Sequence, residues 1–259
     1  MSVSIIVMGV AGRMGSTVAR LAREAGDLTL AAVAERPGVD LSGFGYACLT
    51  GNTVEELLLA CPKAVVVDFT SPEASVAAAG CAAKHGNPMV IGTTGFSPGQ
   101  RGELEKYARA SPLFWSPNMS VGVHVLLKAL PELVRLLGDS YDVDIVELHH
   151  NRKKDSPSGT ALRLAECVAE AKGWKLAETV CCRREGIIGE RPKREIGVQA
   201  VRGGDIVGVH TVYFMGPGER IELTHHAHSR ENFAQGALRA ARWMAGAKPG
   251  KLYSMHDVL

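Results

Sequence analysis

The sequence predicts an α/β protein with a parallel-sheet domain followed by an α+β domain that contains a mixed sheet. Three observations predict this fold. Up to about residue 120, short β-branched runs alternate with helical segments, which is typical of a parallel sheet with helices on both faces. The stretch 196–224 instead lacks helical periodicity and contains glycine-rich turns. The 259 residues are also long enough for two domains.

The first domain is expected to span residues 1–120. Its first strand is the apolar run 3–8, which ends at Gly9, and the helix 16–24 follows with its apolar side chains on one face. The segment Ser71-Pro72-Glu73 begins another helix, because serine is a favourable cap and proline is tolerated in the first turn. The remaining elements are strands at 28–34, 64–69, 89–91 and 113–116, and a helix at 100–109.

The second domain is expected to span residues 121–229. It begins with a long amphipathic helix over 125–137, and the strand 143–149 and the helix 160–172 follow. Three runs separated by glycine-rich turns, at 198–201, 208–214 and 220–224, predict antiparallel strands. The final helix is expected over 233–244.

Charge and composition exclude several classes of protein. The chain has 29 basic and 27 acidic residues, so no strong field favours nucleic acid or a membrane surface. No apolar run approaches the roughly 18 residues that a membrane span needs. The first four residues lack the basic region of a signal peptide. We therefore expect a cytoplasmic protein that binds neither nucleic acid nor membranes.

Neither the cysteines nor the histidines predict a metal site. The six cysteines form no CxxC pair, so we expect mostly buried free thiols in a reducing compartment. In the segment 225–228, His226 and His228 would share one face of a strand and His225 the other, with no acidic residue nearby to complete a site.

A glycine loop joins the first strand to the first helix. Residues 9–15 have the pattern GxxGxxG, in which glycines allow backbone N–H groups to approach a pyrophosphate at a helix N-terminus. Glu35 lies 20 residues after Gly15, where an acidic residue binds the adenosine ribose of NAD. An ordinary turn and a solvated carboxylate are the alternatives. Together the two features predict a Rossmann-like dinucleotide-binding domain.

Arg36 leaves the choice of nucleotide open. Its guanidinium would pair with a 2′-phosphate, which Glu35 would repel, so the pair indicates tolerance of both NADH and NADPH. A surface role remains open for Arg36 and for Arg13.

Two further segments, 92–95 and 116–119, directly follow predicted strands. Ligands of open parallel sheets bind beyond the carboxyl ends of the strands, although both segments are also compatible with ordinary turns.

The segment 147–160 carries the strongest chemical signal. His149 and His150 follow a strand, Lys153 comes next, and Ser158-Gly159-Thr160 begins a helix. The helix N-terminus and the basic side chains would bind a carboxylate, and histidine or lysine would supply a proton. A basic surface loop before a capped helix is the alternative.

The pattern His-His-x-x-Lys-x-Asp-x-Pro-Ser-Gly-Thr within this segment strongly resembles the signature of the dihydrodipicolinate reductase family. The resemblance continues through nearly the whole chain. Its further segments are 7–15, 68–70, 90–96, 118–123, 202–208, 224–225 and 255–259.

The resemblance implies NADH- or NADPH-dependent reduction of a cyclic 4-hydroxy-tetrahydropyridine dicarboxylate in lysine and diaminopimelate synthesis. The family's cofactor-binding positions correspond to Gly9, Val10, Ala11, Gly12, Arg13, Met14, Glu35, Arg36, Gly92, Thr93, Thr94, Ser116, Pro117, Asn118 and Met119. His149 would donate or accept a proton and Lys153 would donate one, while His150, Gly159 and Thr160 would bind the substrate carboxylates. No metal is implied. The second domain would bind substrate and assemble a homotetramer, and residues 230–259 would pack back on the first domain.

The chain departs from the family pattern at His124, Met119, His226 and His228, none of which is a proposed catalytic group.

Two other functions remain open. One is a different NAD(P)-dependent dehydrogenase of a small amino or imino acid, which would lack activity on the cyclic dicarboxylate. The other is a nucleotide sensor without catalysis, for which the segment 149–160 would be dispensable.

Overall fold

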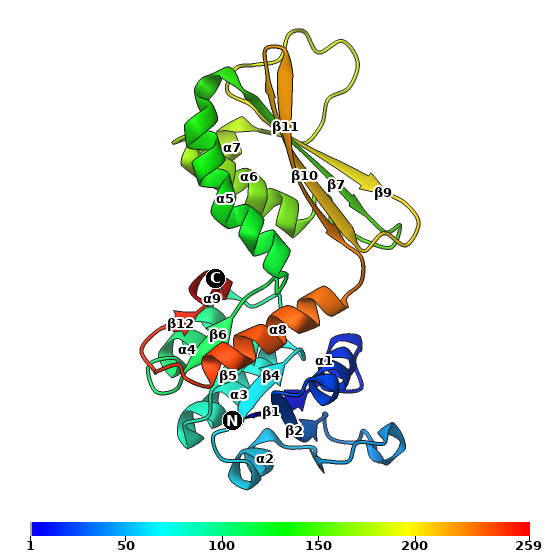
Figure 1. Ribbon diagram of the computed structural model, residues 1–259, viewed down its shortest axis with the longest axis vertical. Coiled ribbons are helices and arrows are strands. Elements are labelled where there is room, and N and C mark those ends of the chain that lie inside the picture. The colour runs from blue at the N-terminus through cyan, green and yellow to red at the C-terminus, as the bar shows by residue number, and fades with distance from the viewer. Residues whose placement is uncertain (1) are drawn as a thin grey trace. The chain divides into compact units, whose positions relative to one another are not determined.

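The structure is a computed structural model that describes residues 2–259. Its contacts divide the chain into two compact units, and Figure 1 labels most of their helices and strands. Unit 1 comprises the chain up to Val121 together with Glu231–Leu259, and unit 2 comprises Gly122–Arg230.

Unit 1 contains a seven-stranded sheet in which every neighbouring pair is parallel. The strand order is β12-β6-β5-β4-β1-β2-β3, so the direction of winding reverses between β1 and β4. Ligands of doubly wound sheets bind at such a reversal, beyond the carboxyl ends of the strands. The strands are β1 (Val3–Met8), β2 (Leu28–Ala34), β3 (Leu49–Gly51), β4 (Val65–Asp68), β5 (Met89–Ile91), β6 (Leu113–Trp115) and β12 (Leu252–Tyr253).

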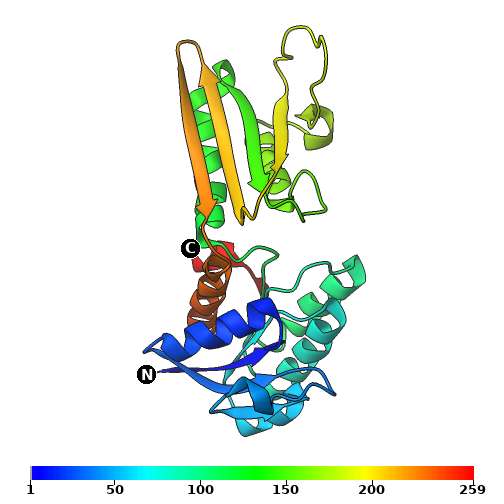
Figure 2. The same ribbon diagram turned by 90° about the vertical axis from the view of Figure 1, so that its right-hand side faces the viewer.

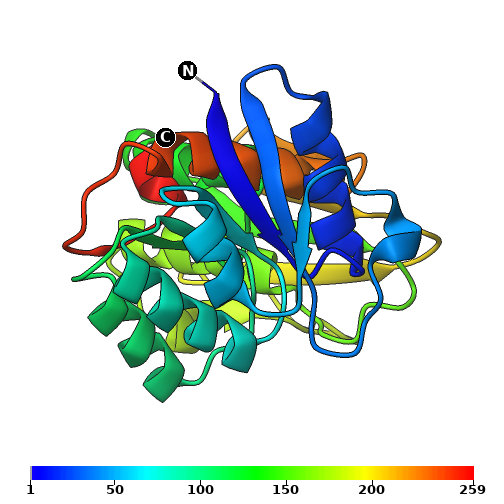
Figure 3. The same ribbon diagram turned by 90° about the horizontal axis from the view of Figure 1, so that it is seen from below.

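Helices cover both faces of this sheet, as Figure 3 shows. Ile5 and Val7 of β1 pack in one core with α1 (Arg13–Glu24) and α8 (Glu231–Met244). Ile6 points to the opposite core, which is formed with α2 (Val54–Ala60), α3 (Pro72–His85) and α4 (Pro98–Tyr107). Adjacent residues of a strand face opposite sides, so a strand covered on both sides is apolar throughout. The unit also contains a 3₁₀ turn (Ser42–Phe44) and the short helix α9 (Met255–Val258).

Unit 2 contains a five-stranded mixed sheet in the order β11-β10-β7-β9-β8. Strand β7 lies at its centre, antiparallel to β10 and parallel to β9. Helices α5 and α6 pack on one face only, the green and yellow-green helices behind the sheet in Figure 2. The elements are α5 (Val121–Leu137), a 3₁₀ turn (Gly138–Ser140), β7 (Asp142–His149), α6 (Gly159–Ala171), α7 (Leu176–Thr179), β8 (Val180–Cys181), β9 (Ile196–Arg202), β10 (Gly208–Gly216) and β11 (Glu219–Ala227).

The fold class is confirmed, and two expectations about individual elements are wrong. The strand expected at 198–201 is not antiparallel, because β9 pairs in parallel with β7 and β8. The crossover through α6 returns the chain in the same direction, which a local pattern does not reveal. The helix at 233–244 is not the last, since α9 follows it. Sequence patterns also missed β3, α2, α7, β8 and β12, all of which are short.

All six cysteines are free, as expected, but the expectation that most are buried is wrong. Only Cys167 is buried, and Cys182 is exposed. Composition gives the average behaviour of cysteine and cannot show which face of an element each one occupies. Within residues 2–259 no helix is both long and apolar enough to span a membrane. The same residues contain no group of three His, Cys, Asp or Glu side chains placed to bind a metal.

Candidate functional site

The glycine loop lies at the reversal of the sheet, directly after β1. Gly9 has a φ of +72°, which favours glycine, and its backbone leads into α1. A Cβ atom at Gly15 would lie 2.1 Å from the carbonyl oxygen of Gly9. The positive φ therefore favours glycine at position 9, and the close packing of α1 on the loop requires glycine at position 15.

The N-terminus of α1 is open to an anion. Gly12 occupies the cap without a side-chain hydrogen bond, and the first turn contains no acidic residue. Unpaired N–H groups and the helix dipole give such an end a positive partial charge. Val10 is fully buried in the core and Met14 packs against it, so these two residues contribute backbone rather than side chains to the loop surface.

Glu35 follows β2 and is held beside the glycine loop. Its carboxylate accepts hydrogen bonds from the Ala11 N–H at 2.9 Å and from the Arg36 N–H at 3.0 Å. Asn52 donates to the carbonyl oxygens of Arg36 and Val39, at 3.1 and 3.4 Å, and so braces the backbone that follows Glu35.

A cavity of about 660 Å³ lies between these elements. Five of the predicted cofactor residues line it: Gly9, Ala11, Gly12, Glu35 and Arg36. Phe69, Thr70 and Ser71, which follow β4, form its other side. The cavity does not include the two predicted segments 92–94 and 116–119.

Asp68, at the end of β4, anchors the segment that follows β5. This carboxyl group is fully buried and accepts hydrogen bonds from the hydroxyls of Thr70, Ser75 and Thr93. Burial raises its pKa, and these hydrogen bonds oppose the shift. The hydroxyl of Thr93 also accepts from the Thr70 N–H at 3.0 Å, so it faces the protein interior, whereas Thr94 is exposed.

The segment after β6 is held from two sides. Ser116 donates to the carbonyl oxygen of Asn118 at 2.5 Å, and the Asn118 side chain accepts from the Ser120 N–H at 2.8 Å. The Met119 side chain is buried in the core. A Cβ atom at Gly236 of α8 would lie 1.8 Å from the Met119 carbonyl oxygen, so the helix packs directly on this backbone. Pro117 is exposed.

In unit 2, His149 ends β7 on the face that the helices cover. The strand alternates, so that Val143, Ile145, Glu147 and His149 all face inward. Glu147 is fully buried, and its carboxylate lies 2.5 Å from the Nδ1 atom of His149. Charge thus replaces apolar packing at the last two inward positions of the strand.

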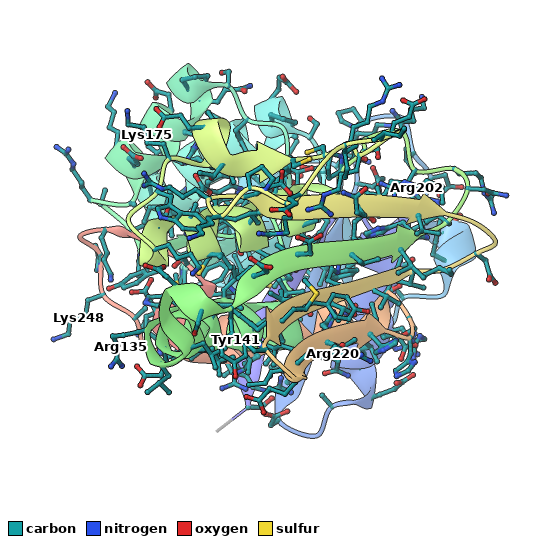
Figure 4. The ribbon with its side chains drawn as sticks, turned by 90° about the horizontal axis from the view of Figure 1, so that it is seen from above. Arg135, Tyr141, Lys175, Arg202, Arg220 and Lys248 are labelled. Atoms are coloured by element: carbon teal, nitrogen blue, oxygen red, sulfur yellow. The ribbon has the colours of Figure 1, made fainter. Side chains whose placement is uncertain are left out.

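Arg202, which Figure 4 labels, lies at the end of β9. It neutralises Glu147 through two hydrogen bonds of 2.7 and 2.8 Å. Burial on its own raises the pKa of Glu147, but the bonds from Arg202 and His149 outweigh it and leave the pKa below its ordinary value. Burial lowers the pKa of His149, and the hydrogen bond to Glu147 offsets only part of that shift. The site therefore holds a carboxylate beside a neutral imidazole at neutral pH.

The same cluster reaches the start of α6. The Ser158 N–H donates to Glu147 at 2.9 Å, and the Ser158 hydroxyl accepts from the Ala161 N–H at 3.2 Å as the helix cap. His210 of β10 lies 3.1 Å from that hydroxyl. Burial, followed by the repulsion that a protonated His149 would exert, lowers the pKa of His210 to about 4, so this ring is neutral.

The remaining predicted residues lie around this cluster. The Lys153 ammonium pairs with the Asp155 carboxylate at 2.9 Å, and its side chain is 21% exposed. The Nδ1 atom of His150 is buried and has no hydrogen-bond partner within the described residues. Gly159 is exposed and Thr160 is half-buried at the first turn of α6.

Sequence reasoning missed Glu147, Arg202 and His210 in unit 2 and Asp68 in unit 1. One signal was available, because Glu147 occupies an inward position of an otherwise apolar alternation ending in His149. Arg202 and His210 gave no such signal, since their proximity depends on the pairing of β7 with two other strands.

Comparisons with known proteins cover both units. Residues 3–119 match the family model "Dihydrodipicolinate reductase, N-terminus", and residues 122–259 match "Dihydrodipicolinate reductase, C-terminus". The 4-hydroxy-tetrahydrodipicolinate reductase of Nitratidesulfovibrio vulgaris strain DP4 is 64% identical over 258 residues, covering 100% of both chains. The relative of that name from Desulfovibrio desulfuricans is 57% identical, also over 100% of both chains.

A solved structure shares the fold over the full length. It is the dipicolinate-bound dihydrodipicolinate reductase of Paenisporosarcina sp. TG-14, with a TM-score of 0.81, 23% identity and 100% coverage of both chains. The two family matches and the full-length relatives lead to one conclusion: this chain belongs to the 4-hydroxy-tetrahydrodipicolinate reductase (dihydrodipicolinate reductase) family.

Proposed function

We propose that this chain reduces 4-hydroxy-tetrahydrodipicolinate to tetrahydrodipicolinate and water, with NADH or NADPH, in diaminopimelate and lysine biosynthesis. The full-length identity of 64% to a reductase of that name carries the choice of reaction. The buried contact between His149 and Glu147, next to Lys153 and the start of α6, supports the assignment of residues.

Unit 1 fits a dinucleotide. The cavity of about 660 Å³ combines the uncapped N-terminus of α1, suited to a pyrophosphate, with the carboxylate of Glu35, suited to ribose hydroxyls. Backbone N–H groups of residues 9–14 would bind the pyrophosphate, and Arg36 is exposed where it would meet a 2′-phosphate. The nicotinamide supplies the hydride when the cofactor is bound.

The segments 92–94 and 116–119 would bind the nicotinamide half of the cofactor. Both follow adjacent strands, β5 and β6, at the carboxyl edge of the sheet. Asp68 holds Thr93, and α8 holds Met119, so their backbones are fixed before any ligand binds. Fixed backbone groups lose little entropy on binding.

Unit 2 would bind the substrate and move the protons. The first turn of α6, at Gly159 and Thr160, would bind one carboxylate, and the Lys153 ammonium and the His150 ring would contact the substrate's carboxylates. Lys153 is then the proton donor. His149, whose ring is neutral at neutral pH, accepts or returns a proton.

We also propose a cytoplasmic homotetramer assembled through unit 2. Helices cover only one face of its sheet. The opposite face carries Val146, Leu148, Val201, Val209, Tyr213 and Met215, with Val201 46% exposed. Sedimentation of the wild type should give a tetramer, and Val201→Glu should shift it towards smaller species. A monomeric wild type would refute the proposed assembly.

The reaction is tested by following NADH and NADPH oxidation with substrate formed in situ from pyruvate and aspartate semialdehyde by a synthase. The wild type should turn over, and His149→Ala and Lys153→Ala should each lose about 10²-fold or more. Lys154→Ala is the matched control, since Lys154 adjoins Lys153 but is exposed, and it should retain activity within about 2-fold.

Cofactor binding without turnover of this substrate would refute the reductase assignment. Undiminished turnover in both His149→Ala and Lys153→Ala would instead leave the reaction intact and refute the residue assignment.

A further inference from the structure

Glu147 lies next to the proposed acid–base residue and has no role in the function described so far. We propose that Glu147 is the positioning residue of His149, holding the ring with the proton on Nδ1 so that Nε2 is the atom that exchanges protons with the substrate. This inference rests on the proposed function, because it assigns a partner to His149 within the same site.

Glu147 determines which nitrogen of His149 carries the proton. Glu147 is ionised and offers only acceptor atoms, and its Oε2 lies 2.5 Å from His149 Nδ1. A neutral His149 must therefore donate from Nδ1, which leaves the Nε2 lone pair as its acceptor.

Position 208 leaves space beside the Nε2 atom of His149. A Cβ atom added at Gly208 would lie 3.0 Å from Nε2, so the absence of a side chain there keeps the atom accessible. His210 packs edge-on against the His149 ring, with 5.1 Å between centroids, and limits its rotation. The ring is held at Nδ1 by Glu147, and no side chain at position 208 covers Nε2.

Hydrogen bonds from three residues fix the orientation of the Glu147 carboxylate. Oε1 accepts from the Ser158 N–H at 2.9 Å and from Arg202 at 2.7 Å, while Oε2 accepts from Arg202 at 2.8 Å. Ala200, opposite Glu147 in the pairing of β7 with β9, is small enough for Arg202 to reach across. Every acceptor position of Glu147 thus has a fixed donor.

These contacts predict what Glu147→Gln does to the ring. The Ser158 N–H is a backbone donor that cannot turn, so the new amide oxygen must occupy the Oε1 position. The amide nitrogen then faces His149 Nδ1, which has to become an acceptor, and Arg202 Nη1, which keeps only its bond to the Val201 carbonyl oxygen. The neutral ring would be forced into the tautomer with its proton on Nε2.

The tautomer of His149 can be measured directly by long-range ¹H–¹⁵N spectra of the full-length protein with ¹⁵N-labelled histidine. His149→Ala identifies the signals of His149. We expect Nδ1–H in the neutral wild-type ring and Nε2–H in Glu147→Gln. An Nε2–H tautomer in the wild type would overturn the proposal without any variant.

Turnover measurements separate positioning from general stability. Glu147→Gln should lower kcat about 10²-fold, and in a His149→Ala background it should cost less than about 3-fold further, since residues that act as a unit are non-additive. An equal loss in both backgrounds overturns the proposal. The control is Asp144→Asn, because Asp144 lies on the same strand and is paired with Arg184 and Arg191 on the other face.

One further variant covers the case in which Glu147→Gln does not fold because Arg202 has lost the carboxylate that neutralises it. Glu147→Gln combined with Arg202→Met removes both charges, and it should show the same inverted tautomer and the same loss of kcat. Loss of turnover in His149→Ala but not in Glu147→Gln would refute the positioning role of Glu147 and leave the proposed role of His149 intact. Full turnover in His149→Ala refutes the role of His149 in the proposed function as well.

Discussion

The two candidate sites of this chain are built from different parts of the polypeptide. In unit 1 the site consists mainly of backbone, in which Gly9 and Gly15 let the loop and α1 approach each other. In unit 2 it consists of buried side chains, with Glu147, His149 and Arg202 in one hydrogen-bonded cluster. We infer that the first site is sensitive to added volume, whereas the second is sensitive to lost or displaced charge.

The largest expected effect on ligand binding comes from adding volume to the glycine loop of unit 1. Gly15→Ala would place a methyl group 2.1 Å from the Gly9 carbonyl oxygen, so α1 must move away from the loop. We expect dinucleotide affinity to fall at least about 100-fold, which corresponds to roughly 2.7 kcal/mol. Fluorescence titration with NADH and NADPH measures it.

Gly102→Ala is the matched control, because this helical glycine of α4 has no atom within 4 Å of an added Cβ. It should bind dinucleotides as the wild type does and gain a few tenths of a kcal/mol in stability, up to about 1. Equal affinity in Gly15→Ala and Gly102→Ala would refute the importance of backbone packing.

The next effect tests charge in unit 2 through pH. The pKa of His210 falls from 6.5 to about 4 on folding, so between these values the unfolded chain binds more protons than the folded chain. The contribution of the neutral His210 ring to the free energy of unfolding is fully present above pH 6.5. It is lost as the pH falls towards 4, and the total loss is about 3 kcal/mol. Hydrogen exchange of the β10 amides at pH 7 and pH 4.5 measures the change.

His210→Gln removes the titrating ring, so most of the pH dependence of stability that comes from His210 should disappear. The same pH dependence in wild type and variant would show that His210 is not the group responsible.

A smaller effect is expected at Asp68, which is a buried side chain in unit 1, where the site otherwise consists mainly of backbone. This residue therefore tests whether unit 1 is also sensitive to a change of charge. Asp68→Asn replaces one acceptor by an amide that faces hydroxyl donors, and leaving such a group unpaired costs about 1–3 kcal/mol. We expect lower stability and weaker cofactor binding as Thr93 loosens. Thermal unfolding with and without NADH measures both, and unchanged binding would refute a positioning role for Asp68.

The smallest effect concerns an exposed charge. Arg36→Ala should weaken NADPH binding by a few-fold and leave NADH binding nearly unchanged, since exposed ion pairs contribute about 0–1 kcal/mol. The ratio of the two dissociation constants measures it. An equal loss for both nucleotides would mean that Arg36 supports the loop rather than a 2′-phosphate.

Local patterns predicted the fold class and many of the groups in both candidate sites. The glycine spacing, the position of Glu35 and the segment 147–160 all depend on residues near one another in the chain. The inward alternation of β7 even places Glu147 and His149 on the same face, because a strand repeats every two residues. The roles of the individual site residues in binding and catalysis stay predictions.

The sequence by itself thus determined the strand–helix alternation, the glycine turn and the composition of the basic segment. Only the tertiary structure brought Arg202 and His210 to Glu147 and His149, placed Thr93 and Ser75 on Asp68, and packed Gly236 on Met119. The physical reason is that strand pairing and helix packing join segments far apart in the chain. The free energy of those contacts comes from burial and charge neutralisation across elements, which no local periodicity encodes.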